Sequence, residues 1–290
     1  MSRNVTVGID ESRESLAAAE WAADEALGRD RLLRLVHVWG TDHMAVTSQV
    51  DPEAQRRWAD ALLVSAAEHV RRLHSDVRLE TAQVSGDPAE ALTAESEGAE
   101  LLVLGSRGIG ALVGFIAGSV SLAVLARARH PVVLVRAHEP EESKSAPAAG
   151  AVVIGLDLRR PSDAALTFAF ECADRYGCGV RVVHSWSLPP MYGPNSAGVL
   201  PMLPDEVSAQ RQQELEVALA PWGEKFPDVT VIRQCQQGHA AQDLVEASPE
   251  ARMIVVGLRH RSSRLGAHVG PVVSAVLHHT AAPVAVVPHD

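Results

Sequence analysis

Short runs of Val, Leu and Ile recur along the chain, separated by longer segments that are rich in Ala or in charged residues. The apolar runs show no alternation with polar residues, which is typical of strands in a parallel sheet covered on both faces. The segments between them repeat apolar residues at helical spacing and begin at residues that favour helix caps. In the first half of the chain, strands are predicted at residues 3–9, 32–38, 77–84, 101–105 and 131–135. Helices are predicted at 12–28, 52–73 and 88–97, and from residue 119 onward.

Residues 101–135 carry the most distinctive polar pattern, because glycines and serines separate two buried strands. Gly105, Gly108 and Gly118 leave the backbone free to adopt positive φ and to approach a ligand closely. The helix that opens with Ser119 to Ser121 begins with N–H groups that have no intrahelical partner, and such an end attracts phosphate. The alternative is that these glycines only shape a surface loop.

Two common glycine motifs do not fit this stretch. The P-loop motif G-x-x-x-x-G-K-[ST] is absent. Gly108, Gly110 and Gly114 nearly match G-x-G-x-x-G, but the last spacing is one residue too long. That dinucleotide motif also belongs after the first strand of its fold, whereas this loop follows the fourth.

The second half of the chain repeats the pattern of the first. Val7 to Asp10 recurs as Ile154 to Asp157, an offset of 147 residues (157 − 10 = 147). Gly105 recurs as Gly257, an offset of 152 residues (257 − 105 = 152), so the second half has five extra residues. They fall in the loop after its second strand, where insertions are tolerated. The chain therefore contains a duplication of a whole domain rather than a short repeat.

Each half is predicted to be an α/β domain with a doubly wound, five-stranded parallel sheet of order 3-2-1-4-5 and helices on both faces. The domains are predicted at residues 1–137 and 151–290, joined by a charged, Pro- and Ser-rich linker at 138–150. In such sheets, ligands bind where the winding reverses, here between strands one and four. Asp10 ends the first strand and Gly105 the fourth, so we expect them to face each other.

Composition excludes several other classes of protein. The net charge of −10 argues against nucleic acid as a partner. No apolar run approaches the length of a membrane span, and the N-terminus lacks a signal sequence, so a soluble, cytoplasmic protein is predicted. Cys172, Cys178 and Cys235 have no C-x-x-C spacing and are predicted to be small core residues rather than disulfide or zinc ligands.

These features resemble the universal stress protein family in its tandem two-domain form, over the whole chain outside the linker. The motif of the ATP-binding members, G-x2-G-x9-G-[ST], is matched by Gly105, Gly108 and Gly118-Ser119. The second half departs from it, because His260 replaces Gly108 and Gly270-Pro271 replaces Gly118-Ser119. We therefore predict that the second half binds nucleotide weakly or not at all.

The resemblance also implies roles for individual residues. ATP would lie beside Asp10, and the backbone around Val38 would meet the edge of the adenine. As a lone carboxylate, Asp10 could help to place Mg²⁺; the alternative is that it caps the next helix. Gly86 would lie near the base and the ribose. The nucleotide-binding residues that the resemblance implies are Asp10, Val38, Gly86, Gly105, Arg107, Gly108, Gly118, Ser119, Val120 and Ser121. In the second half, the alternative is that His260 and His268 supply phosphate contacts of their own.

No catalytic set stands out. Ser119 and Ser121 have no identifiable general base, and His37 and His184, at equivalent strand ends, are predicted to be structural. The leading hypothesis is an ATP-binding stress-response regulator that is not an enzyme. The alternatives are a slow ATPase or nucleotidyl transferase, and a nucleotide-free assembly module.

The fifth strands, at residues 131–135 and 283–287, are apolar and are expected at sheet edges, which invite pairing. In the family that the chain resembles, these strands commonly mediate dimer contacts. The resemblance therefore implies a pseudo-dimer of the two halves within the chain. Two chains could also associate as a homodimer.

Overall fold

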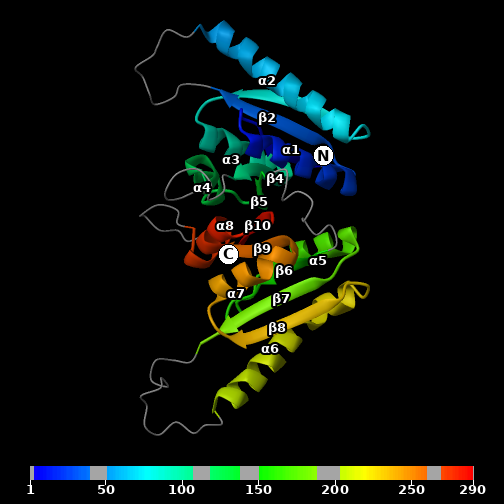
Figure 1. The fold of residues 1–290 in the computed structure, drawn as a ribbon, viewed down its shortest axis with the longest axis vertical. Coiled ribbons are helices and arrows are strands. Elements are labelled where there is room, and N and C mark those ends of the chain that lie inside the picture. The colour runs from blue at the N-terminus through cyan, green and yellow to red at the C-terminus, as the bar shows by residue number, and fades with distance from the viewer. Residues whose placement is uncertain are drawn as a thin grey trace. The chain divides into compact units, whose positions relative to one another are not determined.

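The computed structural model describes residues 3–39, 51–106, 118–137, 150–187, 203–259 and 269–289. The chain divides into two compact units, and Figure 1 colours the first from blue to green and the second from green to red. The predicted linker at 138–150 lies outside the described residues except for Gly150, so the predicted domain boundaries stay predictions.

Strands and helices alternate in both units, as the sequence predicted. The elements of the first unit are β1 (Asn4–Gly8), α1 (Arg13–Gly28), β2 (Leu33–Trp39), α2 (Pro52–Leu73), β3 (Leu79–Ser85), α3 (Pro88–Gly98), β4 (Ala99–Ser106), α4 (Ser119–Leu125) and β5 (Val132–Arg136). Those of the second unit are β6 (Ala151–Gly155), α5 (Asp163–Tyr176), β7 (Val180–Trp186), α6 (Leu203–Lys225), β8 (Val231–Gln237), α7 (Ala240–Ala247), the short 3₁₀ helix η3 (Ser248–Glu250), β9 (Ala251–Arg259), α8 (Pro271–His279) and β10 (Val284–His289).

The strand order is the predicted one in each unit. It is β3-β2-β1-β4-β5 in the first unit and β8-β7-β6-β9-β10 in the second. β1 pairs in parallel with both β2 and β4, and Val7 lies opposite Leu35 on one side and Val103 on the other. The carboxyl ends of β1 and β4 are therefore neighbours at the point where the winding reverses. The predicted doubly wound α/β fold is confirmed.

Helices cover both faces of the first sheet. α1 packs on β1, β4 and β5, and α2 packs on β2 and β3, whereas α3 and α4 pack against each other. Side-chain directions separate the two faces: a Cβ atom on Gly105 would meet the backbone of α1, and one on Gly8 would meet Leu92 of α3. The consecutive residues Leu101 to Leu104 are at most 4% exposed, as expected for a strand covered on both faces. Within the described ranges, no helix is long and apolar enough to span a membrane.

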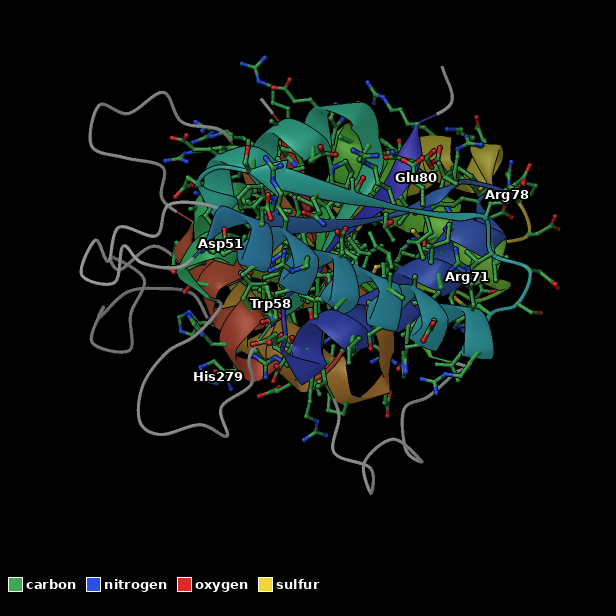
Figure 2. The ribbon with its side chains drawn as sticks, turned by 90° about the horizontal axis from the view of Figure 1, so that it is seen from above. Asp51, Trp58, Arg71, Arg78, Glu80 and His279 are labelled. Carbon is green, nitrogen blue, oxygen red and sulfur yellow. The ribbon has the colours of Figure 1, made fainter. Side chains whose placement is uncertain are left out.

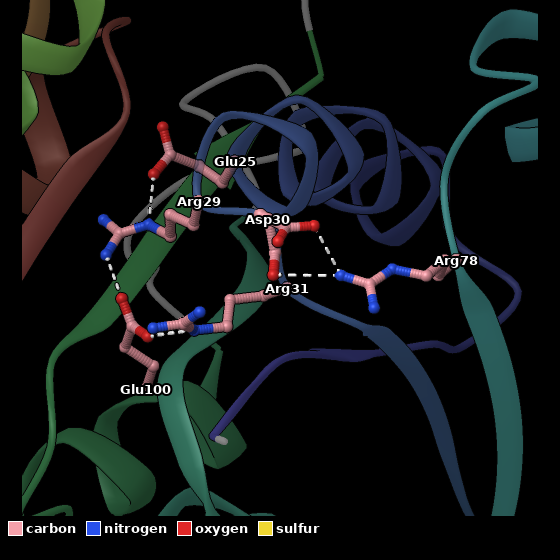
Figure 3. A network of polar contacts seen from close by, with 6 residues as sticks. All are labelled: Glu25, Arg29, Asp30, Arg31, Arg78 and Glu100. Atoms are coloured by element: carbon pink, nitrogen blue, oxygen red, sulfur yellow. Dashed lines mark hydrogen bonds and ion pairs between the residues drawn. The ribbon is translucent and has the colours of Figure 1, made fainter.

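A network of ion pairs holds the C-terminal end of α1 against the start of β4 (Figure 3). Arg29 pairs with Glu25 and with Glu100, each at 2.8 Å, and Arg31 pairs with the other oxygen of Glu100 at 2.8 Å. The side chains of Glu25 and Arg29 are only 2% and 7% exposed, so their charges are poorly screened by water. The network therefore fixes the C-terminal end of α1 relative to the start of β4.

The three cysteines differ in burial. Cys172 is buried in α5, as predicted, but Cys178 and Cys235 are only half-buried. Cys178 lies in the connection before β7, and Cys235 lies on β8, which is the last strand in the order of its unit. The prediction of core cysteines is therefore wrong for these two residues.

Candidate functional site

Asp10 lies two residues after β1 and supports the start of α1. Its carboxylate oxygen Oδ1 accepts hydrogen bonds from the amide of Ser12, at 2.9 Å, and from the Ser12 hydroxyl. Ser12 is the N-cap of α1 and accepts from the amide of Ser15 at 3.1 Å. The Ser15 hydroxyl donates back to the Asp10 carbonyl oxygen at 2.8 Å. Asp10 is thus held rigidly at the carboxyl edge of the sheet, where it is exposed.

Gly105, near the end of β4, packs against the same turn of α1. A Cβ atom on Gly105 would lie 2.6 Å from the carbonyl carbon of Glu14 and 2.7 Å from the amide nitrogen of Ser15. The structure therefore brings Asp10 and Gly105 together around Ser15, as the strand order predicted. Gly105 does not use its freedom to adopt positive φ. Glycine is needed here because a helix backbone lies where a side chain would be.

Gly118 to Ser121 form the start of α4. Gly118 is the N-cap, with φ −56° and ψ 154°, and it provides no side-chain capping bond. The amide of Leu122 donates to the Gly118 carbonyl at 3.0 Å, so the amides of Ser119, Val120 and Ser121 precede the intrahelical bonds. A Cβ atom on Gly118 would have no described atom within 4 Å. Gly118 likewise does not adopt positive φ, and what it supplies is open space beside three amide donors.

Val38 and Gly86 lie together at the ends of β2 and β3. Val38 is half-buried and pairs with Val84, and the amide of Gly86 donates to the carbonyl of Trp39 at 3.0 Å. Gly86 has φ +139°, a conformation that L side chains rarely adopt, so glycine is required at this position. The two residues that the resemblance assigned to the base are therefore neighbours. The other two predicted residues, Arg107 and Gly108, lie outside the described residues.

His37 links the ends of β1 and β2. Its Nδ1 atom donates to the Ile9 carbonyl at 2.8 Å, which confirms its structural role. The ring of Trp58, which Figure 2 shows on α2, meets the His37 ring edge-on at 5.3 Å between ring centroids. The Arg56 guanidinium lies 5.2 Å from the centroid of the Trp39 ring. An aromatic and cationic cluster therefore flanks the ends of these two strands.

The sequence prediction missed two polar residues at the same edge of the sheet, Ser106 and Arg136. They are Cα partners at the ends of β4 and β5. Ser106 is 3% exposed, and its hydroxyl has no hydrogen-bond partner among the described residues. Burial lowers the pKa of the Arg136 guanidinium, because a charge that loses water is disfavoured. Comparison of the two halves could have identified the pair, because the corresponding residues are Leu258 and Pro288.

The second unit keeps the fold of this edge but changes its polar groups. The Nδ1 atom of His184 donates to the Leu156 carbonyl at 2.9 Å, so the predicted structural role of His184 is confirmed. α8 starts at Pro271, which has no N–H to offer, and a Cβ atom on Gly257 would lie 3.1 Å from the ring of His289. His260 and His268 lie outside the described residues, so the alternative that they contact phosphate stays a prediction.

Comparisons with known proteins agree with this architecture. A profile of the universal stress protein family matches residues 1–136 and 150–288. Universal stress proteins of Mycobacterium tuberculosis and Mycobacterium bovis are each 34% identical over 291 residues, covering 97% of this chain and 96% of their own. One from Mycolicibacterium smegmatis is 30% identical over 295 residues, covering 98% of this chain and 96% of its own.

A solved structure gives the same result for the fold. The crystal structure of a universal stress protein from Archaeoglobus fulgidus has a TM-score of 0.76 and 18% identity, covering 99% of this chain and 98% of its own. At that identity the likeness concerns the fold alone. The profile match to both halves and the mycobacterial relatives carry the assignment further: the chain belongs to the universal stress protein family, in its form with two tandem domains.

Proposed function

We propose that this chain is a nucleotide-dependent stress-response regulator that holds ATP at the carboxyl edge of its first sheet. The observation that carries the proposal is the arrangement around Gly118. Three amides precede the intrahelical bonds of α4, no side chain caps them, and a Cβ atom at Gly118 would meet no described atom within 4 Å. A phosphate group accepts hydrogen bonds from such amides. Gly118-Ser119 also completes the glycine motif that the sequence shares with ATP-binding members of the family.

The strand ends offer complementary groups for the rest of the nucleotide. Asp10 is exposed beside Gly105, at the reversal of winding where ligands of such sheets bind. Its carboxylate could help to hold Mg²⁺, which is commonly coordinated by protein carboxylates and nucleotide phosphates together. Val38 and Gly86 present backbone at the neighbouring strand ends, suited to the edge of a base.

The second unit supports a single nucleotide site per chain. At the start of α8, Pro271 removes one of the amides that α4 offers. Gly270 keeps the same extended backbone as Gly118, with φ −62° and ψ 161°, and it too has no described atom within 4 Å of an added Cβ. The difference between the units therefore lies in the polar groups rather than in the backbone.

We favour a regulator over an enzyme because the described part of the chain offers no base to a nucleophile. Neither Ser119 nor Ser121 forms a hydrogen bond with a carboxylate or an imidazole there. A site that positions ATP without a base is expected to hydrolyse it slowly or not at all. The alternatives are a slow ATPase or nucleotidyl transferase and a nucleotide-free assembly module. Cytoplasmic location, pairing of the two halves and a homodimer remain predictions.

The test begins with the purified full-length protein. Denaturation followed by chromatography identifies any retained nucleotide, and calorimetric titration with ATP gives the stoichiometry. We expect one ATP per chain and no rapid release of ADP. Two equivalent sites would contradict the single-site proposal, rapid turnover would favour the enzyme, and absence of binding would favour the assembly module.

A matched pair of variants locates the site. Gly118→Val should abolish ATP binding, because the branched side chain fills the space beside the amides of α4. Gly270→Val introduces the same side chain at the same backbone geometry in the second unit and should leave binding unchanged. Equal effects of the two variants would refute the assignment of ATP to the first unit.

A further inference from the structure

Ser106 is the last residue of β4, and its side chain faces away from α1. Gly105 faces α1, and successive residues of a strand point to opposite faces of the sheet. Leu104 lies on the same face as Ser106, and a Cβ atom on Gly8 would contact both Leu104 and Leu92 of α3. Ser106 therefore faces the layer formed by α3 and α4, one pleat closer to the carboxyl edge than Leu104.

The hydroxyl of Ser106 is unusual because it is buried without a hydrogen bond. Its Oγ atom has no partner among the described residues, and the residue is 3% exposed. Buried polar groups in proteins are nearly always paired, and an unpaired one destabilises the fold. For comparison, the fully buried Ser96 donates to the Thr93 carbonyl at 2.6 Å.

Arg136 is the neighbour of Ser106 on the adjacent strand β5. It is the Cα partner of Ser106 in parallel strands, so both side chains start from the same face of the sheet. Burial lowers the pKa of its guanidinium, because a charge that loses water is disfavoured. A guanidinium carries five N–H donors, more than a single partner uses. A hydroxyl donor and a guanidinium donor thus lie on the face that also carries α4.

In the second unit, the positions that correspond to Ser106 and Arg136 carry no polar side chain. Leu258 and Pro288 occupy the places of Ser106 and Arg136, and Leu258 is 6% exposed. An apolar residue is the ordinary choice at a buried strand end. The polar pair therefore occurs in the unit with the complete glycine motif and not in the other.

We propose that Ser106 and Arg136 are further ligand-binding residues, which hydrogen-bond to the anionic phosphate chain of the nucleotide in the first unit. This inference rests on the proposed function. Both groups act as donors toward an ionised phosphate, which only accepts, and the seryl hydroxyl can rotate to suit it. The phosphate would supply the partner that Ser106 lacks.

The test measures the affinities of the full-length protein for ATP and for adenosine, which has no phosphate, by calorimetric titration. Ser106→Ala and Arg136→Gln should each weaken ATP binding about tenfold or more, the usual effect of losing a hydrogen bond to a charged group. Adenosine binding should not change. Ser106→Thr, which keeps the hydroxyl, should retain ATP affinity.

The stability of the ligand-free protein distinguishes a ligand-binding hydroxyl from a structural one. Removal of a structural hydroxyl lowers stability, whereas removal of an unpaired ligand-binding hydroxyl does not. Ser106→Ala should leave the midpoint of thermal unfolding unchanged or raise it, because it removes an unpaired buried group. The control is Ser96→Ala, which should lower the midpoint and leave ATP affinity unchanged. If Ser106→Ala instead lowers stability without weakening ATP binding, the hydroxyl is structural and the inference is wrong.

The remaining outcomes separate this inference from the proposed function. If the unmodified protein does not bind ATP, both fall. If it binds ATP and both variants bind equally well, only the role of Ser106 and Arg136 falls. If the variants lose affinity for adenosine as much as for ATP, the contact is not with phosphate and the inference is overturned.

Discussion

Gly105 lies directly against Ser15, because a Cβ atom on Gly105 would be 2.7 Å from the backbone nitrogen of Ser15. Ser15 also donates its hydroxyl to the Asp10 carbonyl, so one turn of α1 contacts the ends of both β1 and β4. The first glycine of the motif therefore has a packing role that does not depend on a ligand. Gly118 has no such role among the described residues.

This difference predicts opposite effects of alanine at the two glycines. Gly105→Ala should lower the free energy of unfolding by about 1–3 kcal/mol, since the added methyl group overlaps with backbone that cannot rotate away. Gly118→Ala should leave it unchanged or raise it by about 0.4–1 kcal/mol, because its φ of −56° suits alanine. Urea unfolding of the ligand-free variants measures both. Equal stabilities would show that α1 moves to accommodate the methyl group.

The fold was predictable because it depends on patterns that the chain carries locally. The predicted helix at 52–73 matches Pro52–Leu73, since a proline after Asp51 marks its start and the apolar spacing marks its length. β3 begins at Leu79 rather than at residue 77. The amide of Val77 donates to the His74 carbonyl at 3.3 Å, so Val77 is buried in a turn instead of a strand. An apolar residue looks the same in both settings.

The site was predictable only in part, because its chemistry depends on atoms that are distant in sequence. The strand order correctly brought Asp10 and Gly105 together. The sequence could not show that Gly105 is required by the backbone of α1. Nor could it show that the hydroxyl of Ser106 is buried without a partner beside Arg136, since hydrogen bonds and burial are properties of the packed structure.

The ion-pair network at the other end of α1 predicts a pH dependence of stability. Burial raises the pKa of Glu100, but the hydrogen bonds from Arg31 and Arg29 outweigh it, so the pKa in the folded protein is below its ordinary value. A carboxyl group with a depressed folded pKa stabilises the protein above its unfolded pKa. This stabilisation is lost as the pH falls through the folded pKa.

Glu100→Gln should therefore lower the free energy of unfolding by about 1–3 kcal/mol at neutral pH. The difference from the unmodified protein should shrink below about pH 4.3, where the unfolded carboxyl becomes protonated. Urea unfolding at a series of pH values measures the difference. Glu216→Gln, at an exposed position on α6, controls for the loss of a charge. A difference that is constant down to pH 3 would mean that Glu100 acts through packing alone.

A substitution at the N-cap of α7 should stabilise the protein, because the present residue does not cap the helix with its side chain. His239 occupies the position with extended backbone but makes no side-chain capping bond. The corresponding residue in the first unit, Asp87, accepts from the amide of Glu90 at 2.9 Å. His239→Asn should stabilise the protein by about 0.5–1 kcal/mol, and Asp87→Ala should destabilise it by about 1 kcal/mol. Asparagine is preferred over aspartate because the buried Asp243 lies in the same first turn.

Thermal unfolding measures both cap variants. The two changes lie in helices of different units, so their effects should add in the double variant. If His239→Asn has no effect while Asp87→Ala is destabilising, the backbone at the start of α7 differs from that of α3 more than the dihedral angles indicate.

Variants of Asp10 separate its support of α1 from a role beside the nucleotide. Asp10→Asn keeps a side-chain oxygen that can accept from Ser12, so the stability of the protein should change little. Asp10→Ala removes that acceptor and should lower the free energy of unfolding by about 1 kcal/mol. If the carboxylate also helps to place Mg²⁺, Asp10→Asn should bind ATP with a smaller dependence on Mg²⁺ than the unmodified protein.

The matched control is Asp157, which holds the equivalent place in the second unit and accepts from the amide of Arg159 at 3.0 Å. Asp157→Asn should leave ATP binding unchanged with and without Mg²⁺, measured by the same titrations. An Asp10→Asn variant that responds to Mg²⁺ as the unmodified protein does would restrict Asp10 to its structural role. The site would then depend on the amides of α4 and on donors such as Ser106, because no charge at the end of β1 would be needed to hold the nucleotide.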